Sequence, residues 1–443
     1  MAPWRVPASL LLLAALAFCE PPRAPVVAPV IPPAAQASAH FDAIAATNAW
    51  LATIPAAQRA RSDAYTEGGE WLILWDFLYT LLVMLILLET KLSARMRDWA
   101  ERGTRRHGIQ TALYWIGFMA ASAVLTFPLV IYEDFLREHQ YGLSNQNFHS
   151  WLRDQFIGFG LTLLLGGLAF LAITAIVSRF PRTWHWWGGA VGVVFLVFSI
   201  VIGPVFIEPL FNTYTPLPAS ALKDRILSMA RANGIAANDV YEVDESRQSK
   251  RVSANVSGLF GTERIALNDN LLNRCSPEGV MATMGHEMGH YVLHHLYNDV
   301  LFFGVVILAM FGVLRRALEW MLERWGARWE LRGVSDVAAL PAAVLILATL
   351  GFLFTPIGNT WTRTQEAEAD IFGLNASRQP DGEAEVDLLL GEYRKLDPSP
   401  IEEMLFFDHP GGRTRIYAAM RWKAENLKPI PNGPIRPTER PLR

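Results

Sequence analysis

The stretch EGVMATMGHEMGHYVLHHLYNDVLFFGVVILAMFGVL, residues 278–314, decides the fold because it joins a histidine-rich pattern to an apolar run. Four histidines and one glutamate fall between positions 284 and 295. Ser276 and Pro277 stand just before the stretch, and these residue types favour a helix N-cap and first helical position. The apolar run 298–318 is long enough to cross a bilayer, which takes about 20 residues. The sequence therefore predicts a histidine-bearing helix that leads into a membrane helix.

Residues 286–290, HEMGH, match the H-E-x-x-H pattern of zinc metalloproteases. Histidines four positions apart lie on one face of a helix and can bind the same ion, so His286 and His290 are expected to be zinc ligands. Glu287 lies between them and is expected to act as the general base on a water molecule at the open position of the ion.

Two further histidines follow on the same expected helix. His294 continues the spacing of four, but eight residues of helix separate it from His286 by about 12 Å along the axis. A glycine that would break the helix is absent at Tyr291 and Val292. We therefore expect His294 and His295 to be polar groups at the membrane edge or behind the metal site.

A third ligand must come from another helix, and TRTQEAEADIFG, residues 362–373, is the candidate. Glu366 and Asp370 are four apart and share a helix face, whereas Glu368 is rotated away. Such a pair suits one carboxylate that binds zinc and one that orients a ligand histidine. The alternative is a solvated acidic face, which is the more common meaning of an acidic cluster alone.

Composition indicates a membrane protein. Of 443 residues, 51% are hydrophobic and 18% charged, where about 25% charged is usual for soluble proteins. The net charge of −3 gives no basic field for nucleic acid. Cys19 and Cys275 are too few and too far apart for a disulfide framework.

The first 39 residues predict a leader peptide or a first membrane helix, followed by a linker. Arg5 precedes an apolar run of 14 residues, 6–19, which is short for a span. Small-residue cleavage patterns occur at 35–37 and 37–39. The six prolines within 21–33 predict an extended linker.

Six apolar runs after the leader predict membrane helices, at 71–88, 111–132, 156–178, 186–207, 298–318 and 336–356. The last contains Pro341 and Pro356, which are expected to kink or trim it. Between the runs, 218–234 reads as an amphipathic helix, and 239–244 and 264–269 alternate like strands. The fold expected is a mainly α, multi-pass membrane protein of six to seven spans, with a zincin-like metalloprotease domain that carries a small β-sheet.

The predicted domain organisation follows from these runs. It comprises the leader or first helix with its linker (1–39), an extramembrane segment (40–68), a four-helix membrane region (69–207), a metalloprotease domain with the histidine helix (208–297), a membrane hairpin (298–356), a second metalloprotease part (357–426) and a Pro-rich tail (427–443).

Basic residues concentrate in three connections, 89–110, 179–184 and 315–333. Six spans place these connections on one face, and the positive-inside rule makes that face cytoplasmic. The metal site is then expected on the outer face.

Five motifs in order carry a family resemblance: YGLSNQNFHSWLRD (141–154), PVFIEPLFNTYTPL (204–217), HEMGH, EAEAD (366–370) and DHPGGRTRI (408–416). From about residue 69 to 426 the chain resembles the type I CAAX prenyl endopeptidases, which are membrane-integral zinc metalloproteases of the gluzincin kind. The resemblance implies one zinc ion on His286, His290 and Glu366, with Glu287 as general base and Asp370 orienting a ligand.

The resemblance also implies that His409 stabilises the oxyanion and that Arg415 binds substrate. Without it, these two would be interpreted as a helix start capped by Asp408 and an ordinary surface arginine. Residues 251–270 resemble the strand pair beside the zinc, whose edge can receive a substrate backbone. Eukaryotic members have an asparagine where this chain has Ser253, so Ser253 or Asn255 is expected to bind substrate.

The function expected is hydrolysis of peptide bonds in membrane-associated polypeptides, including C-terminally lipidated ones. Two alternatives stay open: a quality-control protease resembling the HtpX type, for which four spans fit better, and a non-catalytic receptor or transporter with a structural zinc, which would need four protein ligands. The leader suggests a bacterial inner-membrane protein. Loop charge places the zinc on the periplasmic side, whereas analogy with eukaryotic relatives places it on the cytoplasmic side.

Overall fold

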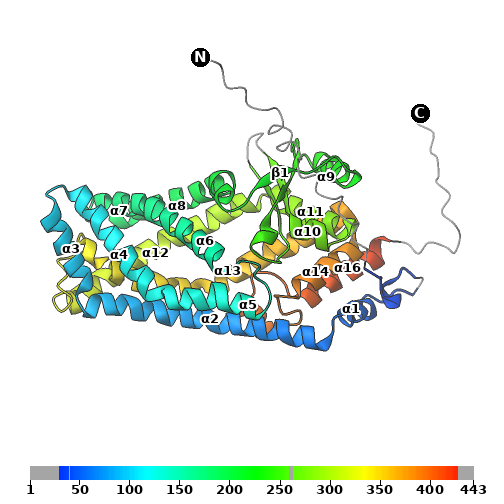
Figure 1. The fold of residues 1–443 in the computed structure, drawn as a ribbon, viewed down its shortest axis with the longest axis horizontal. Helices are drawn as coiled ribbons and strands as arrows, with labels where there is room; N and C mark the ends of the chain where they lie inside the picture. The colour runs from blue at the N-terminus through cyan, green and yellow to red at the C-terminus, as the bar shows by residue number, and fades with distance from the viewer. Residues whose placement is uncertain (1–28, 39, 259–262, 428–443) are drawn as a thin grey trace, which may run out of the picture.

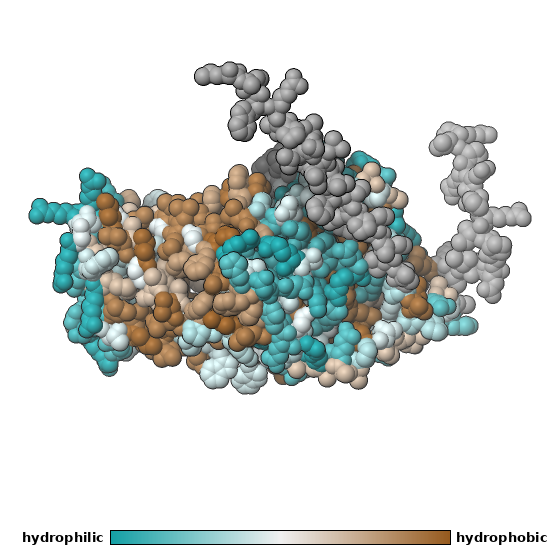
Figure 2. Space-filling model, viewed as in Figure 1, coloured by the Kyte–Doolittle hydropathy of each residue, from teal (hydrophilic) through white to brown (hydrophobic). Residues whose placement is uncertain are grey.

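A computed structural model describes residues 29–38, 40–258 and 263–427. The molecule is elongated, with long helices along one part and a small sheet with shorter helices at the other end (Figure 1). Figure 2 shows a broad hydrophobic surface over the long helices, with hydrophilic residues at both ends of it. The predicted leader run 6–19 and almost all of the predicted tail lie outside the described residues.

Within the described residues, six helical segments are long and apolar enough to cross a membrane, in agreement with the six predicted runs. Pro341 and Pro356 do not trim the sixth one, because Pro341 lies in the first turn, where no N–H is needed, and the helix continues past Pro356. Hydrogen bonds within a helix have no competitor in an apolar medium, which favours this continuation. The segments are Ala56–Glu89, His107–Gln140, Phe148–Arg179, Trp184–Leu210, His295–Trp325 and Val337–Ser377.

Short π-helical turns join shorter helices into three of these segments. They lie at Ile131–Arg137, Thr162–Gly166 and Gly203–Ile207. The helices are α2 (Ala56–Glu89), α4 (His107–Val130), α5 (Glu138–Gln140), α6 (Phe148–Leu161), α7 (Gly167–Arg179), α8 (Trp184–Ile202), α12 (His295–Trp325) and α13 (Leu340–Ser377).

The predicted basic connections meet at the end of the molecule away from the sheet. There α3 (Leu92–Gly103) follows α2, and Lys91 pairs with Glu330 at 2.6 Å. Arg332 pairs with Glu101, also at 2.6 Å. The third connection joins them because an Arg315 Nη1 donates to the Arg182 carbonyl. These contacts link Lys91 and α3 to the connection between α12 and α13, and α12 to the connection between α7 and α8.

The sheet at the other end has four strands in the order β1-β2-β4-β3. The strands are β1 (Tyr214–Pro216), β2 (Val240–Val243), β3 (Ala254–Ser257) and β4 (Arg264–Asn268). β2 and β4 are parallel, and the other two pairs are antiparallel. The predicted strands 239–244 and 264–269 are confirmed, whereas β1 was not predicted. β3 is an edge strand, and no other described strand pairs with its outer side.

The remaining helices surround the sheet and the end of α13 (Figure 1). The histidine helix is α11 (Pro277–Val292), and Ser276 caps it as predicted, accepting a hydrogen bond from the Gly279 N–H. The predicted helix 218–234 is α9, which ends before Gly234, where φ is +74°. The helices of this end of the molecule are α1 (Ala43–Leu51), α9 (Ala221–Ala232), α10 (Asp269–Arg274), α11, α14 (Pro380–Leu390), α15 (Pro400–Phe406) and α16 (Gly412–Asn426).

Part of the predicted linker is packed against this region. Residues Pro33–Ala35 form a short 3-10 turn, and Ala35 is buried in a hydrophobic cluster with residues of α1, α14 and α16. The Nζ atom of Lys423 donates to the Ala35 carbonyl at 2.6 Å. The chain just before one predicted cleavage pattern is therefore part of the folded structure.

Candidate active site

Helices α11 and α13 cross in backbone contact because glycines stand where they meet. A Cβ atom added to Gly285 would lie 2.8 Å from the Gly373 carbonyl oxygen, and one added to Gly373 would lie 2.8 Å from the His286 nitrogen. A Cβ on Gly289 would lie 3.1 Å from the Ala369 Cα. Glycine is the residue that permits such an approach. This crossing places the two faces predicted to carry metal ligands against each other.

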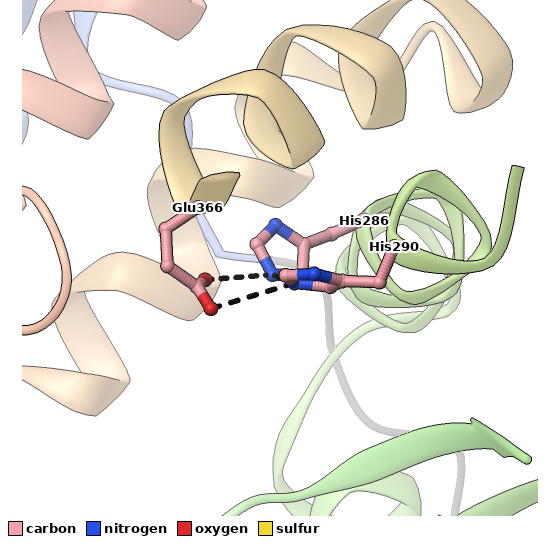
Figure 3. A group of neighbouring side chains, drawn as sticks. All are labelled: His286, His290 and Glu366. Atoms are coloured by element: carbon pink, nitrogen blue, oxygen red, sulfur yellow. Dashed lines mark hydrogen bonds and ion pairs between the residues drawn. The ribbon is translucent and has the colours of Figure 1, made fainter. Parts of the chain in front are cut away.

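The crossing brings His286, His290 and Glu366 together, with all three side chains pointing toward one point from α11 and α13 (Figure 3). Among the described residues, this is the group of three whose ligand atoms all lie within 4.8 Å of one another. The Nε2 atoms of His286 and His290 are 3.1 Å apart. The Glu366 carboxylate oxygens lie 3.1 Å from His286 Nε2 and 3.5 Å from His290 Nε2.

These separations fit a shared zinc ion. Two ligands at about 2.0–2.1 Å from a tetrahedral ion are about 3.4 Å apart, close to the three distances in this cluster. Two histidines and one glutamate are also the donor set of zinc sites that keep one position open for chemistry. The residues present therefore fit the metal that the sequence predicts.

Asp370 lies behind His286 and orients its ring. Its Oδ1 atom is 2.8 Å from His286 Nδ1, so the Nε2 atom is the one left to face the cluster. Arg415 donates to both Asp370 oxygens, at 2.9 and 2.6 Å. The carboxylate is thus fixed from two sides, as a group that orients a metal ligand should be.

Arg415 is surrounded by carboxylates, which differs from the predicted contact with substrate. Besides Asp370, its guanidinium lies 3.2 Å from Glu383 Oε1 and 3.1 Å from Asp387 Oδ1. Burial by itself lowers the pKa of Arg415, but Asp370, Asp387 and Glu383 hold it well above its ordinary value. The substrate-binding role stays a prediction, and these contacts favour a role in positioning Asp370.

Glu383 and Asp387 of α14 were missed in the sequence. They are four apart on one helix face, the same signal that singled out Glu366 and Asp370. Burial raises the pKa of both carboxyls, despite the opposing effect of Arg415. One arginine among three buried carboxylates therefore favours a proton on this pair.

Glu287 and His409 line one cavity of about 190 Å³ beside the cluster. No side-chain hydrogen bond or ion pair of Glu287 is found within the described ranges, and burial raises its pKa. His409 Nε2 lies 3.2 Å from Glu366 Oε2. Both predicted catalytic groups therefore face the same space next to the predicted ligands.

His409 is not at a helix start capped by Asp408, as one interpretation proposed. Helix α16 begins at Gly412 with Gly411 as its N-cap, so His409 lies in the preceding loop. Asp408 Oδ1 is instead 2.7 Å from His409 Nδ1. Burial alone would raise the pKa of Asp408, but the hydrogen bond from His409 holds it below its ordinary value.

Ser253 and Asn255 lie at the edge strand. Ser253 is exposed just before β3 and lines the same cavity as Glu287. Asn255 pairs with Ala266 across the ladder, and its Oδ1 atom is buried without a hydrogen-bond partner in the part of the chain described. Substrate binding by either residue stays a prediction; Ser253 is the one of the two that lines the cavity.

The expectation of an unbroken helix through the four histidines was wrong. Helix α11 ends at Val292, and His294 adopts the left-handed conformation with φ of 59° before α12 begins at His295. No glycine signals the break in the sequence, because other residues also adopt this conformation at a cost. His294 is exposed as expected, but His295 turns back so that its Nδ1 lies 2.9 Å from His290 Nδ1.

Comparison with known proteins gives matches along nearly the whole described chain. Residues 45–213 match the family described as CAAX prenyl protease N-terminal, five membrane helices, and residues 216–423 match peptidase family M48. An uncharacterized metalloprotease of Bacillus subtilis, YhfN, is 30% identical over 338 residues, which cover 75% of this chain and 79% of that protein. CAAX prenyl protease 1 of Saccharomyces cerevisiae is 26% identical, with 71% of this chain and 74% of that protein covered.

The fold also matches a solved structure. The crystal structure of Ste24p from S. mikatae superimposes with a TM-score of 0.70 at 21% identity, over 83% of this chain and 89% of that one.

Proposed function

The chain belongs to the CAAX prenyl protease family within peptidase family M48 and is a membrane metalloprotease, and from this premise we propose that it is a zinc endopeptidase acting on membrane-associated polypeptides. The observation that carries the proposal is the convergence of His286, His290 and Glu366 beside Glu287, which pairs with no described side chain. His286, His290 and Glu366 would hold one ion, and Asp370 would orient His286.

A zinc ion bound there would polarise the scissile carbonyl and lower the pKa of an attacking water. Glu287 would take the proton of that water and later return it to the leaving amine. Two features of this chain suit Glu287 to this role. The carboxylate has no competing partner among the described side chains, and burial raises its pKa toward the working range.

His409 would stabilise the negative charge that develops on the carbonyl oxygen. Asp408 Oδ1 lies 2.7 Å from His409 Nδ1 and orients the ring, so Nε2 is the nitrogen on the side of Glu366, at 3.2 Å from its Oε2. With Glu366 bound to the ion, this Nε2 would be the atom that donates to the carbonyl oxygen. One positioned donor of this kind is worth about 3 kcal/mol of barrier.

The substrate would lie along the outer edge of β3 as an added strand, with Ser253 or Asn255 binding its backbone. Membrane-associated polypeptides, including C-terminally lipidated ones, are the proposed substrate class. The basic connections at the far end support a cytoplasmic location for that end, and so a periplasmic metal site in a bacterial inner membrane. Alkaline phosphatase fused to the C-terminus would then be active, whereas a well-expressed but inactive fusion would contradict this orientation.

Both alternative functions fit the structure less well. The six apolar segments in the described part of the chain exceed the four spans that fit the HtpX type. A structural zinc site is closed by four protein ligands, whereas the described residues bring three candidate ligands together.

Substitution of Glu287 by Gln tests the proposal, with Glu278→Gln in the first turn of the same helix as the matched control. Glu287→Gln is expected to keep one zinc ion per chain and to lower kcat/KM for a quenched peptide about 10²- to 10⁴-fold. Glu278→Gln should leave kcat/KM unchanged. Full peptidase activity in zinc-loaded Glu287→Gln would refute the assignment of the base.

A further inference from the structure

We propose that His295 and Glu368 form a relay that positions the metal-binding ring of His290, an inference that rests on the proposed zinc site. His290 has two ring nitrogens with different surroundings. Its Nε2 faces His286 Nε2 and the Glu366 carboxylate. Its Nδ1 faces His295 Nδ1 at 2.9 Å.

Hydrogen-bond chemistry fixes the proton positions along the relay. When His290 Nε2 offers its electron pair to a metal, the ring proton must be on Nδ1, which then donates to His295 Nδ1. His295 therefore accepts at Nδ1 and carries its own proton on Nε2. That nitrogen lies 3.2 Å from Glu368 Oε2, which accepts the proton's hydrogen bond. Each contact specifies the next, so with a neutral His295 this arrangement leaves His290 Nε2 free for metal.

The surroundings of His295 support this role over that of an ordinary buried histidine. Its side chain is nearly inaccessible, with 2% of the residue exposed, and each of its two nitrogens contacts a side chain of the relay. The left-handed turn at His294 aims it back at His290. Glu368, which sequence periodicity places off the metal-facing side, is the far end of the relay.

The two ligand histidines are therefore supported differently. His286 is held directly by the buried Asp370, which Arg415 fixes in turn. His290 is held through a second imidazole by Glu368, whose side chain is 59% exposed. The relay makes His290 the ligand whose orientation depends on a group near the surface.

The test compares zinc affinity, by chelator competition on the purified full chain, in three variants. His295→Phe keeps the ring volume but removes the acceptor, and we expect zinc affinity to fall about 10- to 100-fold. His295→Asn keeps an acceptor near the Nδ1 position and should restore affinity to within a few-fold of wild type. Glu368→Gln should give a smaller loss. Tyr297→Phe, close by on the same helix but outside the relay, is the control and should change nothing.

Thermal unfolding of the metal-free variants separates positioning from packing. The relay predicts that His295→Phe and His295→Asn unfold within a few degrees of each other yet differ in zinc affinity. Equal zinc affinity in wild type and His295→Phe would overturn the proposal, as would an equal loss in Phe and Asn variants. Failure of wild type to bind zinc, or full activity of Glu287→Gln, would instead refute the proposed function.

Discussion

Substitution of Gly373 by Ala probes the helix crossing that assembles the metal site. The added Cβ would lie 2.8 Å from the backbone nitrogen of His286, where ordinary van der Waals contact begins at 3.4 Å. Because the backbone fixes the position of the Cβ and the nitrogen is itself main chain, neither atom can rotate away. The helices must therefore separate by about 0.6 Å at His286, the first proposed ligand.

That displacement decides the size of the expected effect. Overpacking of this kind costs about 1–3 kcal/mol of folding free energy. Ligand distances in a metal site tolerate only about 0.2 Å, so a shift about three times larger should weaken zinc binding at least tenfold. Both losses should appear together, because one contact causes them.

Gly351 provides the matched control on the same helix. A Cβ there meets no atom within 4 Å, so Gly351→Ala should preserve zinc affinity and keep or raise the unfolding temperature. The assay is zinc content and chelator competition on purified protein, with thermal unfolding in parallel. If Gly373→Ala matched Gly351→Ala in both measurements, the close crossing would not be what holds the ligands in place.

Two further predictions concern Glu383 and His294. Burial raises the pKa of Glu383, so its stabilising contribution is complete below the unfolded-state pKa of about 4.3 and is lost as pH rises through the higher folded-state value. The unfolding free energy should therefore fall with rising pH, and Glu383→Gln should reduce the slope of this fall by up to about 1.4 kcal/mol per pH unit. An unchanged slope would show that Glu383 is ionised in the folded protein. His294→Gly should relieve left-handed strain of about 1–2 kcal/mol and retain zinc, whereas His294→Val should lose stability and zinc affinity. Similar stability and zinc affinity in the two variants would contradict the left-handed conformation at position 294.

Local periodicity was enough to predict several parts of the molecule. Apolar runs located all six spans, and spacing of four found the helix faces that carry His286, His290, Glu366 and Asp370. These features depend on residues close in sequence, where helix geometry fixes which side chains share a face. The family resemblance added His409, which lies next to Glu366 although nothing in its local sequence required this.

The missing parts depend on contacts between distant segments or on single backbone angles. The carboxylates around Arg415 come from α13 and α14, which are distant in the sequence. The sequence alone therefore predicted a surface or substrate-binding arginine. The turn at His294 has no glycine to announce it. The close approach of Gly285 and Gly373 becomes visible only when both helices are placed, although each glycine stands beside a predicted motif.

Because the proposed site is divided between α11 and α13, its parts are synthesised at different times. Glu366 follows His290 by 76 residues, and Arg415, which holds Asp370, follows later still. At translation rates of about 5–20 residues per second, Glu366, the proposed third ligand, is synthesised about 4 to 15 s after His290. The nascent chain therefore carries an incomplete site until the intervening hairpin has been synthesised. The order of synthesis alone withholds peptide-bond cleavage until that hairpin is available to enter the bilayer.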